Sequence, residues 1–465
     1  MLQIDPTSST SLVSQIVEGI KEHISTQKLR PGSKVLSIRQ FADTHGVSSS
    51  TVVEAYDRLV AEGYLVPRQS SGFFVRAANR SLYREESQSL RNIRFDPLWF
   101  VRRVWENSTA DITPGYGWIP DPWLDDELMR RAMRSVAAKP GIHGSGYGLP
   151  KGLTALRLKI CDWLAEQEIS AAPDQVLLTT GASHALQLVA RYLIRPGDTV
   201  LADEPGYSVM IANLRALGAN VIGIPWTPTG PDLKVLEQLA RQHKPRAFFT
   251  NARLHNPTGA SYATNVAYRV LQMAERYDFI IVEDDVCADL DMSKRRSLAC
   301  MDQLNRVVYV TSYSKSISPK LRVGFVVADA DAIEDMTQIK MMTGLTSCEF
   351  TERLALELLN EGRYRKQIKA LKEQVASARE SVSHRLRSSG LELFADADCG
   401  LFIWAKHPAF EDSLKLCNMA LQSNLLLAPG HLFMVGGQSS PWIRFNVGFS
   451  DNHKLYEYLA KVTPE

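Results

Sequence analysis

The sequence predicts two folded parts: a small N-terminal helical module that ends in a β-hairpin, and a larger α/β domain with a mostly parallel sheet. The chain has 465 residues, which is more than one compact core usually holds. Helix-like periodicity followed by two short strand patterns fills the first 76 residues. From residue 111 onward, strand-like and helix-like segments alternate, which is typical of a parallel sheet covered by helices on both faces.

The composition is that of a globular protein with little excess charge. Lys and Arg number 53, Asp and Glu number 51, and the net charge is +2, so any contact with nucleic acid must come from a local patch. No apolar run reaches the length of a membrane span, and Asp5 lies where a signal peptide needs apolar residues. Six scattered cysteines without C-x-x-C spacing indicate reduced thiols. We therefore expect a cytoplasmic protein without a membrane partner or a metal site.

Three helices and a hairpin are predicted in the N-terminal module. Apolar residues recur every four positions from Leu12 to Ile24, and Ser37 forms a capping-box pattern with Gln40. Gly46 makes the next turn, and Ser48 can cap the helix that follows. The predicted elements are helices 11–25, 38–45 and 50–62, strands 63–66 and 72–75, and a polar tip at 67–71. This order is the plan of a winged helix-turn-helix.

The segment from Pro31 to Val75, PGSKVLSIRQFADTHGVSSSTVVEAYDRLVAEGYLVPRQSSGFFV, resembles the DNA-binding domain of GntR-type regulators almost end to end. The resemblance implies promoter DNA as a partner. The residues that it implies to approach DNA are Arg39, Ser48, Ser50, Thr51, Arg68 and Gly72. Their chemistry fits, because hydroxyls and backbone amides at a helix N-terminus bind phosphate, and arginine binds phosphate or guanine.

One position departs from the family pattern. GntR-type domains usually have an arginine directly after the cap serine, where this chain has Ser49. The missing guanidinium removes about 1–3 kcal/mol of base discrimination. Residues 1–80 hold nine Lys or Arg and seven Asp or Glu, a weak field for a DNA-binding module. A module used only for protein contacts is the alternative, but we expect DNA binding, through a dimer that doubles the phosphate contacts.

A connector at residues 77–110 separates the two predicted domains, which span residues 1–76 and 111–465. Residues 77–92 are polar and charged without a sustained apolar period, which indicates a linker. Residues 91–105 regain apolar side chains, and this pattern suits a segment that docks on the second domain.

The stretch from Thr311 to Gly324 is the centre of the predicted chemistry in the second domain. It follows an apolar, β-branched run that reads as a buried parallel strand. Lys315, at the end of that strand, is expected to be partly desolvated, which favours the neutral amine that attacks aldehydes. Ser312, Ser314 and Arg322 supply hydrogen-bond donors for a phosphate. These residues together predict a site for pyridoxal phosphate, bound covalently through Lys315; the alternative is an ordinary charged loop.

The other candidate residues also follow predicted strands. Those strands are 175–180, 199–202, 220–224, 247–250, 279–283, 307–311 and 323–327. Ligands of such sheets bind beyond the carboxyl ends of the strands. The turn Gly181-Ala182-Ser183 joins a strand to a helix, and its amides and hydroxyl can hold phosphate.

The order of these motifs resembles fold type I pyridoxal phosphate-dependent aminotransferases. The resemblance implies that Tyr207 stacks on the pyridine ring and that Asn256 in His-Asn-Pro-Thr-Gly donates to the phenolic oxygen. It assigns Asp284 to the pyridine nitrogen, where a buried carboxylate keeps the ring protonated. Asp285 is the fallback for that role and is otherwise expected to cap a helix.

Two more segments complete the resemblance. Tyr147, in Gly-Tyr-Gly-Leu-Pro-Lys-Gly, matches the tyrosine that is offered to the partner subunit's phosphate, which implies a homodimer. Arg444 matches the residue that clamps an α-carboxylate through two parallel hydrogen bonds. Many relatives have a tyrosine two or three positions after the pyridine aspartate, where this chain has Val286 and Cys287. The missing hydroxyl puts efficient turnover in doubt.

A winged helix fused to an aminotransferase-like domain resembles the MocR family of bacterial transcription regulators. The resemblance covers nearly the whole chain and implies a regulator that senses pyridoxal phosphate, a small amino compound, or both. Two alternatives stay open: an active aminotransferase with an accessory helix-turn-helix module, and a scaffold with a vestigial cofactor site.

Overall fold

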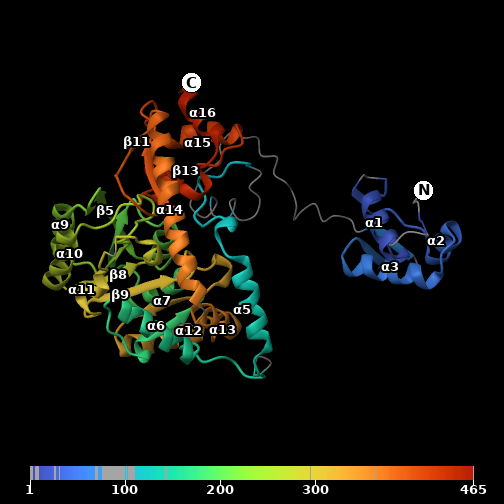
Figure 1. Cartoon of the computed structure of the whole chain (residues 1–465), viewed down its shortest axis with the longest axis horizontal. Coiled ribbons are helices and arrows are strands. Elements are labelled where there is room, and N and C mark those ends of the chain that lie inside the picture. The colour runs from blue at the N-terminus through green and yellow to red at the C-terminus, as the bar shows by residue number, and fades with distance from the viewer. Residues whose placement is uncertain are drawn as a thin grey trace. The chain divides into compact units, whose positions relative to one another are not determined.

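The computed structural model describes residues 4–5, 10–25, 28–30, 32–68, 72–75, 100, 102, 110–141, 144–293, 295–360 and 362–463. The chain divides into two compact units, Met1–Asn92 and Ile93–Glu465 (Figure 1). The predicted linker at 77–92 lies outside the described residues. In the segment predicted to dock on the second unit, Phe100 is described and is buried in a cluster with Trp404 and Phe433.

The first unit consists of three helices and a two-stranded sheet. Its elements are α1 (Leu12–Ser25), α2 (Ile38–His45), α3 (Ser49–Ala61), β1 (Leu65–Arg68) and β2 (Gly72–Val75). The predicted capping box between Ser37 and Gln40 is present, and Gly46 ends α2 in the left-handed conformation. Ser48 caps α3 by accepting from the Thr51 backbone N–H at 3.1 Å. Residues at helical spacing, such as Ile16 and Tyr56, are fully buried in its core.

The hairpin extends further than the sequence indicated. Pro67 and Arg68 were expected in the polar tip, but they lie in β1, opposite Phe73 and Gly72. Proline is tolerated there because each strand of a two-stranded sheet is an edge strand, where one N–H side needs no partner. The rest of the expected tip, residues 69–71, lies outside the described part.

The second unit is built on an eight-stranded sheet with the order β3-β10-β9-β8-β7-β4-β5-β6. Its strands are β3 (Val176–Thr179), β4 (Thr199–Glu204), β5 (Asn220–Thr227), β6 (Gly230–Pro231), β7 (Ala247–Thr250), β8 (Ile280–Asp284), β9 (Val307–Ser312) and β10 (Gly324–Val327). β9, β8, β7, β4 and β5 pair in parallel, as predicted. β10 is antiparallel to both β3 and β9, and β6 is antiparallel to β5.

Helices cover both faces of this sheet, so its side chains alternate between two cores. Leu177 packs in one core, and its neighbours Val176 and Leu178 pack in the other. The helices of the first core are α7 (Ala182–Leu193), α8 (Ser208–Ala216) and α12 (Ala330–Gly344). The helices of the second are α5 (Asp126–Ala138), α6 (Thr154–Glu166), α9 (Leu233–His243), α10 (Thr264–Tyr277), α11 (Leu298–Asp302) and α13 (Glu349–Asn360).

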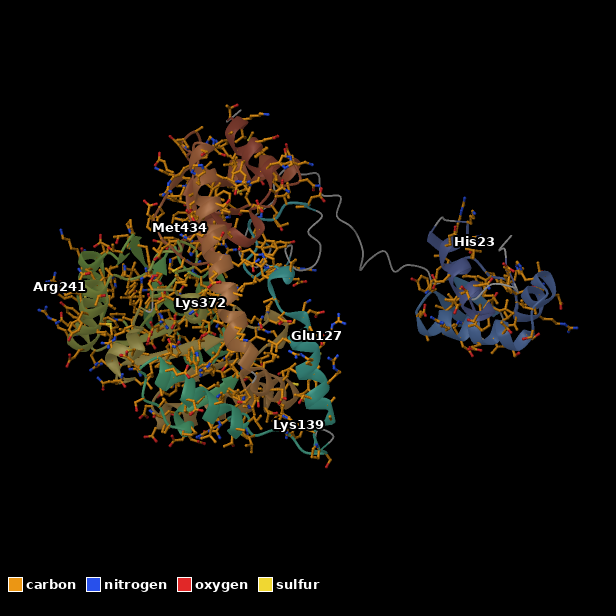
Figure 2. The ribbon with its side chains drawn as sticks, in the orientation of Figure 1. His23, Glu127, Lys139, Arg241, Lys372 and Met434 are labelled. Carbon is orange, nitrogen blue, oxygen red and sulfur yellow. The ribbon has the colours of Figure 1, made fainter. Side chains whose placement is uncertain are left out.

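A second, four-stranded antiparallel sheet was not predicted from the sequence. Its order is β11-β12-β14-β13, with β11 (Glu392–Leu393), β12 (Phe402–Lys406), β13 (Ala428–Pro429) and β14 (Trp442–Asn446). It packs with α15 (Ser413–Gln422), α16 (His453–Lys461) and the long α14 (Gly362–Ser388). In α14, Tyr364 packs in the core of the large sheet, and Leu371, Val375, Val382 and Leu386 pack in that of the small sheet. Lys372 lies part-way along this helix (Figure 2). α14 therefore joins the two cores.

Short 3-10 turns complete the second unit: η1 (Asp121–Trp123), η2 (Pro173–Gln175), η3 (Ala288–Leu290), η4 (Pro319–Leu321), η5 (Gly430–Phe433) and η6 (Val447–Phe449). Among the described residues, no helix is both long and apolar enough to cross a membrane.

Candidate functional site

The strand order brings most of the predicted site residues together at the carboxyl ends of the strands of the large sheet. Asp284 ends β8, Lys315 follows β9, and Asn256 lies in the turn after β7. Gly181 follows β3, and Tyr207 follows β4. These five strands run in the same direction and include four consecutive neighbours, so their carboxyl ends form one rim.

Lys315 lies in this rim with its amino group enclosed. Its Nζ donates a hydrogen bond to the carbonyl oxygen of Gly117. Burial lowers the pKa of Lys315 to about 8, because the charged ammonium loses water contacts. A fraction of a lysine with this pKa is the neutral amine near neutral pH, and the neutral amine is the form that attacks an aldehyde.

Asp284 supplies a buried carboxylate without a full set of partners. Its side chain is 8% exposed, and its Oδ1 has no hydrogen-bond partner among the described residues. Burial, and after it the neighbouring charge of Asp285, raise the pKa of Asp284 to about 7. Such an orphaned acceptor fits a protonated ring nitrogen, which would restore the charge and supply the missing donor.

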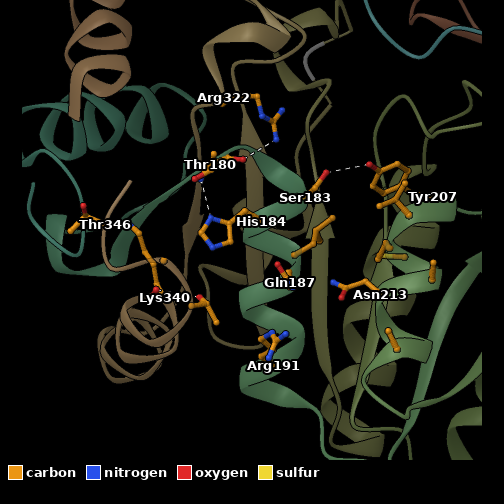
Figure 3. A pocket seen from close by; sticks show the side chains of 17 residues that line it. Thr180, Ser183, His184, Gln187, Arg191, Tyr207, Asn213, Arg322, Lys340 and Thr346 are labelled. Carbon is orange, nitrogen blue, oxygen red and sulfur yellow. Dashed lines mark hydrogen bonds between the residues drawn. The ribbon is translucent and has the colours of Figure 1, made fainter. Parts of the chain in front are cut away.

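The phosphate-binding residues predicted from the sequence meet at the start of α7. Gly181 has φ +83°, and a Cβ at this position would lie 2.7 Å from Nη2 of Arg322. Arg322 donates to the Thr180 carbonyl oxygen at 2.8 Å and has a left-handed backbone, with φ +53°. The Ser183 hydroxyl lies 3.3 Å from the Tyr207 hydroxyl (Figure 3). Free amides of α7, a hydroxyl and an exposed guanidinium form a cradle suited to an anion.

The end of β9 also abuts this cradle. Ser312 pairs with Gly324, where a Cβ would lie 2.9 Å from the Ala182 backbone nitrogen. The Ser314 backbone N–H donates to the Ser312 hydroxyl at 3.4 Å. The two serines, Ala182 and the glycine turn therefore belong to one part of the rim.

Arg444 enters the site from β14 of the small sheet. It donates to Asn256 Oδ1 at 3.0 Å and to the Gly115 carbonyl oxygen at 2.7 Å, and its Nε has no partner among the described residues. Its guanidinium carbon lies 4.7 Å and 4.9 Å from the ring centres of Phe402 and Phe433. Burial lowers the pKa of Arg444 to about 10. A buried cation with neutral partners and a free N–H is suited to a carboxylate ligand.

A cleft of about 890 Å³ lies beside the anion cradle, not around Lys315. It is walled by α7, α8 and the end of α12 (Figure 3). Thr180, Ser183, Tyr207 and Arg322 line it, so the cradle opens into this cleft, while Lys315 and Arg444 are not among the residues that line it.

In the first unit, the candidate DNA-binding residues cluster around the start of α3. Arg39, Ser48, Ser49 and Ser50 are exposed. The Ser48 hydroxyl is engaged locally, 2.8 Å from the Ser50 hydroxyl and 2.7 Å from that of Thr51. Its first role is therefore to cap α3.

The hairpin carries the remaining two candidates. Arg68 and Gly72 face each other across its last pair. Gly72 has φ +94°, which explains the glycine at this position.

Comparison with known proteins places both units. The model of aminotransferase class I and II matches residues 125–462, more than half of the chain. The chain belongs to the class I and II aminotransferase family. The model of bacterial regulatory proteins of the gntR family matches residues 12–75, so the first unit is a GntR-type helix-turn-helix domain. The fusion is the one found in the MocR family.

Individual relatives support both halves of this assignment. The uncharacterized HTH-type transcriptional regulator YdcR of Escherichia coli is 26% identical over 449 residues, which cover 94% of each chain. The 2-aminoadipate transaminase of Thermus thermophilus is 29% identical over 356 residues, 74% of this chain and 88% of that one. The structure of Pyrococcus horikoshii kynurenine aminotransferase has a TM-score of 0.73 at 24% identity and covers 82% of this chain and 96% of that one. Pyridoxal phosphate is the cofactor supported by the family and the fold, and Asp284, Gly181 and Lys315 fit it.

In this aminotransferase unit, Asp285 does not cap a helix as expected. It is fully buried and accepts from Arg253 Nε at 3.1 Å and from the Tyr309 hydroxyl at 2.8 Å. The ion pair with Arg253 explains why two consecutive carboxylates coexist here: Asp285 is neutralised within the protein and Asp284 is not. The next short turn, η3, has Cys287 at its N-cap position instead.

Cys287 occupies one of the two positions where many relatives have a tyrosine. Its side chain is 1% exposed, and burial raises the pKa of the thiol to about 12. The thiol therefore stays protonated at neutral pH. Val286 packs against the core of the small sheet and offers no polar group.

The sequence analysis missed Asn251, which links two parts of the site. Its Nδ2 donates to the Asp284 carbonyl oxygen, and its Oδ1 accepts from the Asn256 backbone N–H at 2.7 Å. One amide side chain thus ties the end of β8 to the turn whose Asn256 contacts Arg444. Its signal in the sequence was a polar residue directly after a buried strand, like the signal of Asp284.

Tyr147, which the sequence analysis assigned to a cofactor phosphate, lies at the surface of the single chain. It lies between α5 and α6 and is 84% exposed.

Proposed function

We propose that this protein is a pyridoxal phosphate-dependent transcription regulator of the MocR type. It binds promoter DNA through its GntR-type unit and senses the cofactor, a small amino compound, or both in its aminotransferase unit. The observation that carries the proposal is the presence, in one chain, of a helix-turn-helix unit and a site that retains Lys315 together with the buried Asp284 and Arg444. The match to YdcR over nearly the full length of both chains supports the same assignment.

Each part of the cofactor has residues suited to it. Pyridoxal phosphate supplies a carbonyl group that reacts with amines and a ring that withdraws electrons. Lys315 would hold it covalently, Asp284 would face the ring nitrogen, and Asn256 would donate to the phenolic oxygen. Tyr207 would pack on the ring. The residues for the phosphate would be Gly181, Ala182, Ser183, Ser312, Ser314 and Arg322.

The effector is proposed to be a small amino compound that carries a carboxylate. Arg444 is the basis, because it is 7% exposed and its hydrogen-bond acceptors in the protein are neutral. A carboxylate would complete its coordination and offset the cost of burying the charge. Asn256 accepts from Arg444, so occupancy of Arg444 would be felt at the cofactor's phenolic oxygen.

The proposed assembly is a homodimer in the cytoplasm. Tyr147 would reach the phosphate of the partner subunit, and paired GntR-type units would double the number of phosphate contacts on DNA. On the DNA side, Arg39, Ser48, Ser50, Thr51, Arg68 and Gly72 are the proposed contacts.

An active aminotransferase is the second candidate. Lys315, with a pKa of about 8, and Arg444 favour it, as does the 29% identity to the 2-aminoadipate transaminase. Cys287 argues against efficient turnover, because a buried, protonated thiol is a weaker hydrogen-bond donor than a tyrosine hydroxyl. A slow site would keep the amino compound bound long enough to act as a signal.

One experiment tests the regulator against the enzyme. A panel of amino acids is added to the cofactor-loaded protein, and visible absorbance, affinity for its promoter fragment and keto-acid formation are measured. We expect one compound to change absorbance and DNA affinity together with little turnover, and Arg444→Ala to abolish both responses. The Arg39→Ala/Thr51→Ala variant should keep the absorbance response and lose DNA affinity. Rapid turnover with DNA affinity indifferent to every compound would favour the aminotransferase.

A further inference from the structure

The loop that carries Tyr147 is anchored by two buried charged side chains. Lys340 of α12 donates through Nζ to the Pro150 carbonyl oxygen at 2.7 Å. Glu352 of α13 accepts from the Leu153 backbone N–H at 2.8 Å. Their side chains are 1% and 3% exposed. The two ionisable side chains thus bind loop residues that are three positions apart, Pro150 and Leu153, just after Tyr147 in the sequence.

The same anchor reaches the anion cradle through Leu178 of β3. Lys340 also donates to the Leu178 carbonyl oxygen at 2.9 Å, and the Leu178 N–H donates to the Lys151 carbonyl oxygen at 3.0 Å. The loop packs tightly here, because a Cβ at Gly152 would lie 2.5 Å from the Leu178 side chain. Two residues after Leu178, Thr180 contacts Arg322. The Tyr147 loop and the anion cradle therefore both contact the carboxyl end of β3.

Lys340 also lines the cleft beside the cradle, together with Thr180 and His184 (Figure 3). Burial lowers the pKa of His184, and the positive charges of Lys340 and Arg322 lower it further. The ammonium group of Lys340 therefore lies close enough to the cradle to be felt electrostatically by a side chain in its wall.

Stability alone does not account for a lysine at this position. Both of its hydrogen-bond acceptors are neutral carbonyl oxygens. Burial lowers the pKa of Lys340 to about 8 although the nearby Glu352 carboxylate acts to raise it, so the opposite charge does not offset the cost of burial. Apolar residues of similar volume often replace buried ions without loss of stability. What methionine could not provide is a simultaneous link to the loop and to the strand.

We propose that Lys340 and Glu352 are positioning residues for the Tyr147 loop. They hold this loop in a fixed position relative to the anion cradle of the same chain, so that Tyr147 can complete the phosphate site of the partner subunit. The proposal rests on the proposed function, in which Tyr147 acts across a homodimer. Lys340 sets the loop relative to β3, and Glu352 sets its exit into α6. Neither residue touches the cofactor; both act through Tyr147.

The test is a double-mutant cycle on the full-length protein, with the dissociation constant of pyridoxal phosphate measured by absorbance titration. Lys340→Met and Tyr147→Phe should each weaken cofactor affinity about three- to tenfold, as expected for one lost hydrogen bond. The double variant should be no weaker than the weaker single variant, because Lys340 acts through Tyr147. Lys369→Met, at an exposed lysine of α14, is the matched control and should bind normally.

Several outcomes would overturn the proposal. Additive losses in the double variant would mean that Lys340 acts independently of Tyr147. Unchanged cofactor affinity in Lys340→Met, even with a lower melting temperature, would reduce Lys340 to a purely structural residue. A wild-type protein that does not bind the cofactor, or a Tyr147→Phe variant that binds normally, would remove the proposed trans contact and this proposal with it.

Glu352 decides the question if Lys340→Met does not fold. Glu352→Gln keeps an oxygen that can accept from the Leu153 N–H and should bind the cofactor nearly as wild type does. Glu352→Leu lacks that acceptor and should lose affinity, again without further loss on adding Tyr147→Phe. Faster hydrogen exchange at Leu153 should accompany the loss. Equal affinity of the Gln and Leu variants would contradict the positioning role.

Discussion

At the scale of single residues, the cofactor site is shaped by one physical cause with two opposite effects. Burial disfavours charge, so it lowers the pKa of Lys315 to about 8 and raises that of Asp284 to about 7. Near neutral pH, the cofactor-free site thus holds a lysine of which a fraction is the neutral amine, and a carboxyl group that readily becomes an anion when a cation arrives. This is the pair of properties that a reactive carbonyl on a protonated ring requires.

Lys315 is predicted to be the residue that binds the cofactor covalently. Borohydride treatment of the loaded protein should fix the cofactor to the peptide that contains Lys315, as detected by mass spectrometry. Lys315→Ala should reduce fixation to background and remove the visible absorbance band, with the fold retained. Lys320→Ala is the control, because Lys320 is nearby in sequence and its side chain is 84% exposed. Cofactor recovered on another lysine would refute the assignment.

Asp284 is predicted to make the stability of the cofactor-free protein depend on pH. Its pKa rises from 3.8 to about 7 on folding, so the folded state holds this proton more tightly than the unfolded chain. Its contribution to stability is therefore present below pH 3.8 and is lost as the pH rises towards 7. The loss should be on the order of a few kcal/mol.

The measurement is the melting temperature of the cofactor-free wild-type protein and of Asp284→Asn, from about pH 4.5 to about pH 8. The asparagine does not titrate, so the melting temperature of the variant should rise relative to that of the wild type as the pH increases across this range. It should also bind the cofactor more weakly. Parallel melting curves with pH would contradict the raised pKa.

At the scale of elements, α3 carries the main departure from its family. Its first turn presents Ser48, Ser49, Ser50 and Thr51, a run of hydroxyls without a guanidinium. Hydroxyls contact phosphate well but discriminate bases less than arginine does. The nearest candidate for base recognition is then Arg39 on α2, which is exposed.

Ser49→Arg is predicted to strengthen and sharpen DNA binding. The new guanidinium at the start of α3 should add about 1–3 kcal/mol of preference for guanine at one position of the site. The salt dependence of the affinity should steepen by about one counterion if the side chain meets a phosphate instead. Ser381→Arg, on the exposed face of α14, adds the same charge to the other unit and is the control. Identical base preferences in both variants would mean that α3 does not approach the bases.

At the scale of the whole molecule, two units share one chain, and regulation requires that their binding events be coupled. Coupling is a free energy, so it acts equally in both directions. The ligand can change DNA affinity only by the difference between its own affinities for the two states of the protein.

The prediction is reciprocity. If an amino compound changes affinity for promoter DNA by some factor, saturating DNA should change the affinity of that compound by the same factor, typically five- to 150-fold. Isothermal titration with and without the DNA fragment measures it. Arg444→Ala should bring both factors to one. Unequal factors for wild type would show that the compound also binds outside the aminotransferase unit.

The sequence by itself determined the features that depend on residues close together in the chain. The capping box at Ser37, the turn at Gly46 and the strand end before Lys315 were all predicted, because helix caps, turns and short strands are set within a few residues. The order of these local features was enough to indicate both units and the cofactor.

Only the tertiary structure decided which buried polar groups meet. Arg444 bonds to Asn256 across 188 residues, and Asp285 pairs with Arg253, while Oδ1 of its neighbour Asp284 has no hydrogen-bond partner among the described residues. Nothing in local spacing separates the two carboxylates, because their partners are chosen by the packing of distant elements. The small sheet that carries Arg444 and the anchor at Lys340 also depend on long-range contacts, and for that reason the sequence did not reveal them.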